Sequence, residues 1–144
     1  MDSIRIIKEA FKVKEERNWE KVYFLFDIHG TIFKPSYYNE EKYEFYPYAK
    51  EALQLITNDS EIVSILWTCT SDENVQKYYD YLKSCNINFD YINENPEIVN
   101  TKLSCFQKKM YCSAGFDDKF GFNPLTDWED IFYYFWNKDI GKRL

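Results

Sequence analysis

An apolar run that ends in an aspartate and a glycine turn limits what this chain can fold into. The run covers residues 21–27 and leads directly into His29-Gly30-Thr31. Strands that are apolar along their whole length are typical of parallel sheets covered on both faces. Such a strand delivers its last side chain to the crevice at its carboxyl end, and Gly30 frees the next loop to bend around a ligand. The pattern predicts a parallel sheet with Asp27 at its ligand-binding edge.

The rest of the chain alternates between helix-like and strand-like segments. Apolar residues at helical spacing, proline and polar capping residues mark the helices, and short apolar runs mark the strands. The predicted helices are an N-terminal helix over residues 1–18, a helix opened by Pro47, a helix capped by Ser71 or Asp72, and a C-terminal helix over residues 126–138 that starts in a capping box. The predicted strands cover residues 21–27, 62–67, 89–92 and 110–116.

Length and composition predict one folded domain. A chain of 144 residues with 45% apolar and 20% aromatic residues has enough apolar surface to form one core. We expect a single domain that spans residues 1–144. Residues 32–46 are too few for a separate cap domain and are predicted to form a short lid-like loop. Alternating strands and helices favour an α/β fold. We therefore expect a single Rossmann-like three-layer domain with a central parallel sheet and a minimal cap or none.

Charge and cysteine content indicate which ligands the protein does not bind and in which cell compartment it works. The formal net charge of -6 opposes general nucleic-acid binding, because the chain would repel a phosphate backbone. The four cysteines lack C-x-x-C spacing, and a single histidine does not complete a usual structural zinc set. The N-terminal residues do not resemble a signal peptide, and no stretch is long and apolar enough to span a bilayer. A cytoplasmic protein with reduced thiols and no membrane association is expected.

Polar side chains follow three of the predicted strands. Asp27 ends the first, Thr68 follows the second, and Asp117-Asp118 follows the weaker run at residues 110–116. The carboxyl ends of parallel strands share one edge of a sheet, so these side chains should converge on one crevice. Carboxylate oxygens are the ligands that Mg²⁺ prefers. The sequence predicts a magnesium site there.

Each assignment has a structural alternative. Asp27 and the Asp117-Asp118 pair also suit turn positions, where aspartate is common. Thr68 is equally a β-branched strand end, and Ser64 or Thr70 would take its place if the strand register were shifted.

The order of these residues resembles the four motifs of the haloacid dehalogenase superfamily. Asp27 to Thr31 matches the first motif, Thr68 the second, Lys109 the third and Asp117-Asp118 the fourth, and the likeness covers about residues 23–122. The segments around Trp67, 89–96 and 109–118 are similar to a small capless branch found in bacteria and phages.

The resemblance implies phosphoryl transfer through an aspartyl phosphate. Asp27 would be the nucleophile, and Mg²⁺ would be bound by Asp27, Asp117 and the backbone carbonyl of His29, with Asp118 placing the metal or its waters. Thr68 would hydrogen-bond a phosphoryl oxygen, and Lys109 would supply a fixed positive charge. Lys108 and Lys102 are alternatives for Lys109.

His29 departs from the family pattern, in which the second residue after the nucleophile is usually an aspartate that acts as acid and base. Imidazole can serve both roles near neutral pH, but protonation beside a metal is disfavoured. The resemblance implies a phosphatase acting on a small phosphoester or nucleotide, and the alternative is a catalytically impaired binding or regulatory protein with the same fold. A receiver domain fits less well, because its acidic pair would end the first strand. The aromatic cluster at residues 132–136 suits core packing or a dimer contact, so monomer and homodimer both stay open.

Overall fold

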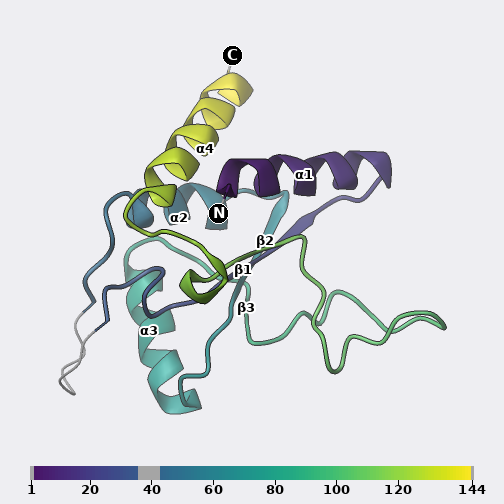
Figure 1. The fold of residues 1–144 in the computed structure, drawn as a ribbon, viewed down its shortest axis with the longest axis horizontal. Coiled ribbons are helices and arrows are strands. Elements are labelled where there is room, and N and C mark those ends of the chain that lie inside the picture. The colour runs from purple at the N-terminus through teal and green to yellow at the C-terminus, as the bar shows by residue number, and fades with distance from the viewer. Residues whose placement is uncertain (1, 36–42, 144) are drawn as a thin grey trace.

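The computed structural model describes residues 2–35 and 43–143 and shows a parallel sheet with helices packed against it (Figure 1). The four strands are hydrogen-bonded in the order β3-β2-β1-β4, and all three pairings are parallel. This confirms the predicted Rossmann-like α/β fold. The elements are α1 (Ser3–Glu16), β1 (Val22–Phe26), α2 (Ala49–Thr57), β2 (Ile62–Leu66), α3 (Asp72–Ser84), β3 (Tyr91–Ile92), β4 (Ala114–Phe116), the short 3-10 helix η1 (Asp118–Phe120) and α4 (Asp127–Arg143).

The main core lies between one face of the sheet and the helices. Phe24 and Phe26 of β1 are fully buried on this face. The Phe24 ring meets Phe11 of α1 edge to face at 6.2 Å, and the Phe26 ring stacks on Trp128 of α4 at 6.0 Å. Aromatic rings bury large areas, and these contacts attach α1 and α4 to the central strand.

The opposite face of the sheet is covered by irregular chain. Tyr23 of β1 contacts Tyr111 edge to face at 6.0 Å, and Lys21 pairs with Glu97 at 3.4 Å. Both partners belong to the long connection between β3 and β4, residues 93–113, which we call the β3–β4 segment. It extends away from the helical body at the right of Figure 1. The layer on this side of β1 is therefore built by turns and loops.

All four strands are shorter than predicted: β1 and β2 differ by one residue at one or both ends, and β3 and β4 differ most. β3 has two residues instead of the four expected at 89–92, and β4 has three instead of the seven expected at 110–116. Just before β4, the hydroxyl of Ser113 accepts the Tyr23 N–H at 3.0 Å, so a side chain takes the place of a backbone partner. The N–H of Ser113 still donates to the Tyr23 carbonyl at 2.7 Å, and regular pairing begins at Ala114, four residues after the start of the predicted run.

The C-terminal helix is longer than the predicted 126–138 and begins at Asp127. The carboxylate of Asp127 accepts the Asn123 N–H at 2.8 Å. The side-chain hydrogen bond at the start of this helix therefore goes to a residue that precedes Thr126, the first residue of the predicted helix. Ile131 and Phe135 are buried, whereas Tyr133 and Trp136 are 47% and 41% exposed. Part of the aromatic cluster at 132–136 is thus core and part is surface.

Three other predictions concern the lid-like loop, the cysteines and membrane spans. Residues 36–42 of the predicted lid-like loop at 32–46 lie outside the described residues. The cysteines are all free. None of the helices in the described ranges is long and apolar enough to cross a membrane.

Candidate metal and phosphate site

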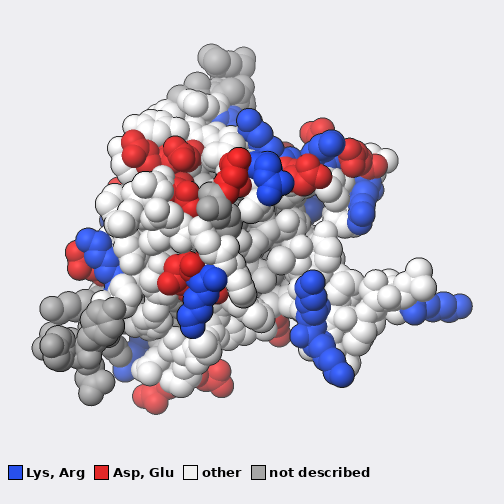
Figure 2. Space-filling model, viewed as in Figure 1, with Lys and Arg blue, Asp and Glu red and all other residues white. Residues whose placement is uncertain are grey.

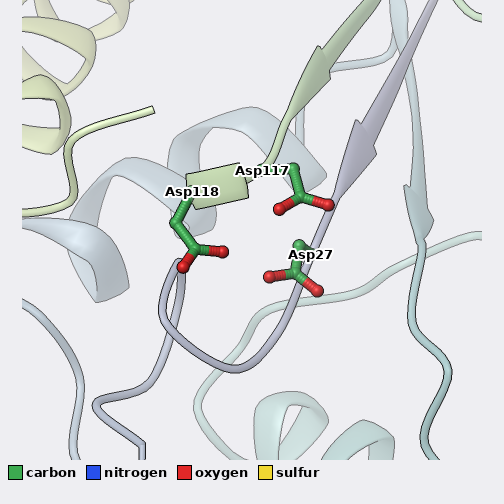
Figure 3. Close-up of side chains that lie close together, drawn as sticks. All are labelled: Asp27, Asp117 and Asp118. Carbon is green, nitrogen blue, oxygen red and sulfur yellow. The ribbon is translucent and has the colours of Figure 1, made fainter. Parts of the chain in front are cut away.

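Three carboxylates meet at the carboxyl end of the two neighbouring strands β1 and β4. Asp27 follows β1 directly, and its N–H donates to the carbonyl of Phe116 at 3.0 Å, so the parallel pairing continues one residue beyond the assigned strand. Asp117 therefore lies beside Asp27, and Asp118 follows it at the start of η1. One oxygen from each acid lies within 4.8 Å of the others, and Figure 3 shows the three side chains around a common space.

The Gly30 turn brings the loop after β1 up against Asp118. Gly30 has φ of +79°, a region that residues with a Cβ seldom adopt. A Cβ built on Gly30 would lie only 2.7 Å from Oδ2 of Asp118. The position thus requires glycine twice, for its backbone conformation and for the space that the Asp118 carboxylate occupies.

Thr31 joins the two halves of this acidic site. Its buried hydroxyl donates to Oδ2 of Asp27 at 3.2 Å and accepts the N–H of Asp118 at 3.1 Å. The carbonyl of Thr31 accepts from the indole Nε1 of buried Trp128 at 2.7 Å. Sequence reasoning gave Thr31 no role, although its fixed place one residue after Gly30 was a usable signal. Nothing in the sequence pointed to Trp128, because its contact depends on how α4 packs.

Burial, and after it the charge of the neighbouring acids, raises the pKa of two of the carboxylates. Burial raises the pKa of Asp27 to about 7, the charge of Asp117 adds to this, and the Thr31 hydrogen bond opposes it. Burial also raises the pKa of Asp117, while its hydrogen bond from the Lys119 N–H lowers it. No lysine is among the groups that shift the pKa of Asp27 in the described structure. Because so little positive charge offsets these carboxylates, the cluster favours binding of a cation.

The residues present fit Mg²⁺. Magnesium takes oxygen ligands at about 2.1 Å, so two ligands of one ion lie no more than about 4.2 Å apart. The three carboxylate oxygens lie within 4.8 Å of one another, a slightly wider spacing. Small side-chain rotations or a bridging water can make up the difference. Asp27, Asp117 and Asp118 could hold the ion, and no hydrogen bond in residues 2–35 and 43–143 engages the carbonyl of His29.

His29 lies on the same turn but its ring is held by α3. The Nε2 atom of His29 is 2.7 Å from the hydroxyl of Tyr78, and the two rings meet edge to face at 5.0 Å. Burial lowers the pKa of His29, so the neutral imidazole prevails at pH 7. A neutral imidazole can accept a proton but cannot act as a strong acid.

Thr68 lies two residues beyond Leu66, the last residue of β2. Asn93 holds its peptide from both sides: Oδ1 accepts the Thr68 N–H and Nδ2 donates to the Thr68 carbonyl, each at 2.8 Å. The Thr68 and Thr70 hydroxyls are 2.9 Å apart. Ser64 is fully buried within β2, which removes it as the alternative to Thr68, whereas Thr70 stays close by.

The three candidate lysines all lie in the β3–β4 segment and are exposed. Burial raises the pKa of the Cys112 thiol, and the charge of Lys109 opposes that shift. Within the described chain no ion pair joins Lys109 to Asp27. Lys108 lines a cavity that also contains Trp67. Figure 2 shows blue side chains on this extension at the lower right. The role of Lys109 stays a prediction, with Lys108 and Lys102 as its alternatives.

Comparison with known proteins finds one informative likeness. A solved structure of a conserved protein from Bacteroides thetaiotaomicron superposes with a TM-score of 0.62 and 21% sequence identity. The match covers 82% of this chain and 92% of the other. At this identity the likeness shows the fold alone. No protein-family model and no curated protein matches the chain.

Proposed function

We propose that this protein is a magnesium-dependent phosphoric monoester hydrolase that acts through an aspartyl phosphate on Asp27. The observation that carries the proposal is the meeting of the Asp27, Asp117 and Asp118 oxygens within 4.8 Å at the carboxyl edge of a parallel sheet. Ligands of such sheets bind at this edge. The resemblance of the four motifs to the haloacid dehalogenase superfamily supports the same chemistry.

The reaction requires two displacements at phosphorus. One carboxylate oxygen of Asp27 forms a bond to phosphorus while the bond from phosphorus to the ester oxygen breaks, and the departing oxygen takes a proton to become an alcohol. A water molecule then gives up a proton and attacks phosphorus, which breaks the bond to Asp27 and releases inorganic phosphate. The nucleophile is regenerated.

The side chains around Asp27 have separate tasks. Thr31 orients the attacking carboxylate, and it favours the charged form because its hydroxyl donates to Oδ2. Asn93 holds the backbone of Thr68, whose hydroxyl would turn from Thr70 to donate to a phosphoryl oxygen. Lys109 would supply positive charge. Bound Mg²⁺, held by Asp27, Asp117, Asp118 and the His29 carbonyl, would offset the repulsion between the nucleophile and the phosphate.

A binding or regulatory protein with impaired turnover is the second candidate, and the state of His29 favours it. The lowered pKa leaves His29 neutral at pH 7, so it suits the base of the second displacement better than the acid of the first. The two candidates differ in whether phosphate is released at a measurable rate.

Phosphate release tests the proposal. Native protein should release phosphate from an aryl phosphate or a nucleotide with Mg²⁺ but not with chelator, and Asp27→Asn should abolish this while remaining folded. Near-native release by Asp27→Asn would disprove the nucleophile. Silence from folded native protein, with turnover restored in His29→Asp, would establish the impaired protein instead.

A further inference from the structure

A cavity of about 590 Å³ opens between the ends of β2 and β3 and the β3–β4 segment. Trp67 and Asn93 line it on the side of the sheet, and Phe106, Gln107 and Lys108 line it from the segment. The volume is in the range of small-molecule sites. A larger cavity of about 680 Å³ lies by Lys21 and Tyr23 at the start of β1, the end of the strand opposite to Asp27. None of the three acids is among the residues that line either cavity.

The smaller cavity adjoins the candidate reaction site. The N–H of Trp67 donates to the carbonyl of Phe26 at 2.8 Å, and Leu66 pairs with Phe26. Trp67 therefore lies beside Asp27, each as the first residue after its strand. Neighbouring strands lie about 4.8 Å apart. Asn93, which lines the cavity, also holds the Thr68 peptide. The cavity therefore lies at the same edge of the sheet as Asp27, at the end of the neighbouring strand.

Trp67 offers a flat apolar face at this position. Its side chain is 42% exposed, and no aromatic ring of the described chain packs against it. An exposed indole in a cavity wall suits a planar ring, because stacking removes the contacting face of each of the two rings from water. Phe106 contributes a second ring to the same cavity.

The polar groups of the cavity suit a ring with hydrogen-bonding edges. The amide of Gln107 carries both a donor and an acceptor, and no hydrogen bond in the described residues engages its side chain. Glu94 and Lys108 both line the cavity, so their opposite charges offset each other and suit a neutral ring. In contrast, Oδ1 of Asn100 already accepts the Phe106 N–H at 2.8 Å, which stabilises the segment that forms the wall.

We infer that this cavity binds the base of a nucleoside 5′-monophosphate whose phosphate lies at Asp27. The inference rests on the proposed hydrolase function and names its substrate class. The base stacks on Trp67, and the Gln107 amide hydrogen-bonds its edge. Hydrolysis then breaks the bond between phosphorus and the 5′ oxygen, consumes one water, and gives the nucleoside and inorganic phosphate.

Two matched substrates and two matched tryptophans test the inference. Adenosine and uridine 5′-monophosphates carry a base at the position where ribose 5-phosphate carries the anomeric hydroxyl. Base stacking of this kind corresponds to about 5- to 150-fold in affinity. Native protein should therefore prefer the nucleotides by a kcat/KM ratio in that range or above it, and Trp67→Ala should reduce this ratio by about 5- to 150-fold. Trp136→Ala, at 41% exposure on α4, should leave the ratio unchanged.

Binding of unphosphorylated uridine and adenosine, followed by NMR chemical shifts, separates the two hypotheses. Loss of nucleoside binding in Trp67→Ala but not in Trp136→Ala supports the base site even if no phosphate is ever released. Equal kcat/KM for ribose 5-phosphate and the nucleotides, unchanged in Trp67→Ala, overturns the base site and leaves the hydrolase intact. A Gln107→Leu variant should bind both nucleosides more weakly, and unchanged binding would remove Gln107 from the site.

Discussion

At the scale of the residue, the hydroxyl of Thr31 links the carboxylate of Asp27 to the backbone of Asp118, which is far away in the chain. It donates to Asp27 and accepts from the Asp118 N–H, 87 positions away. Because the hydroxyl is buried, no water replaces it when it is removed. The residue therefore couples the stability of the domain to the geometry of the acidic site.

Thr31→Val keeps the shape of the side chain and removes both hydrogen bonds. We expect a loss of about 1–3 kcal/mol in the free energy of unfolding, because the Asp118 N–H is left without its partner. The pKa of Asp27 should rise further, since a hydrogen bond that favours its charged form is lost. Urea unfolding measures the first effect. Thr31→Ser retains the hydroxyl and is the control; equal losses in both variants would contradict this account.

The raised pKa of Asp27 makes the stability of the metal-free protein depend on pH. Its ordinary value is 3.8 and its folded value is about 7, so between these limits the folded state binds more protons than the unfolded state. The free energy of unfolding should therefore fall as pH rises from about 4 to 7. With chelator present, Asp27→Asn should be more stable than native protein at pH 8, and the difference should shrink by pH 5. Asp130→Asn on exposed α4 is the control, and a pH-independent difference would be contrary evidence.

At the scale of the element, the turn after β1 depends on a close approach that only glycine allows. In Gly30→Ala the positive φ costs about 1–2 kcal/mol. The added Cβ, at 2.7 Å from Oδ2, also forces Asp118 to move. We expect lower stability and weaker Mg²⁺ binding, measured by thermal unfolding with and without the ion. Gly115→Ala in β4 adds a Cβ with nothing within 4 Å and should resemble native protein. Similar losses in both variants would mean that the Asp118 contact is not responsible.

At the scale of the whole molecule, metal binding should appear as global stability. An ion that binds only the folded state at 100 times its Kd stabilises by about 2.7 kcal/mol. Mg²⁺ should therefore raise Tm by several degrees in a domain of 144 residues. Asp117→Ala should remove the shift. A Tm shift that persists in Asp117→Ala would place the ion elsewhere.

The sequence by itself determined the fold class and the strand ends that carry the acids. Apolar strand runs alternate with helical periodicity, and that alternation predicts a parallel sheet whose carboxyl edge collects the residues that follow each strand. Asp27 and Asp117 follow paired strands as expected. These features are local, since each depends on the residues of a single strand and the turn after it.

Tertiary structure decided the lengths of β3 and β4, the irregular layer over Tyr23, and the partners of Thr31. Before β4, the hydroxyl of Ser113 takes the place of a backbone acceptor for the Tyr23 N–H, and the apolar run at 110–116 gives no sign of that contact. Trp128 reaches the Thr31 carbonyl from 97 positions away, and Asp118 meets Gly30 only once both turns are folded. These contacts depend on how distant elements pack, and single-segment periodicity contains no information about that packing.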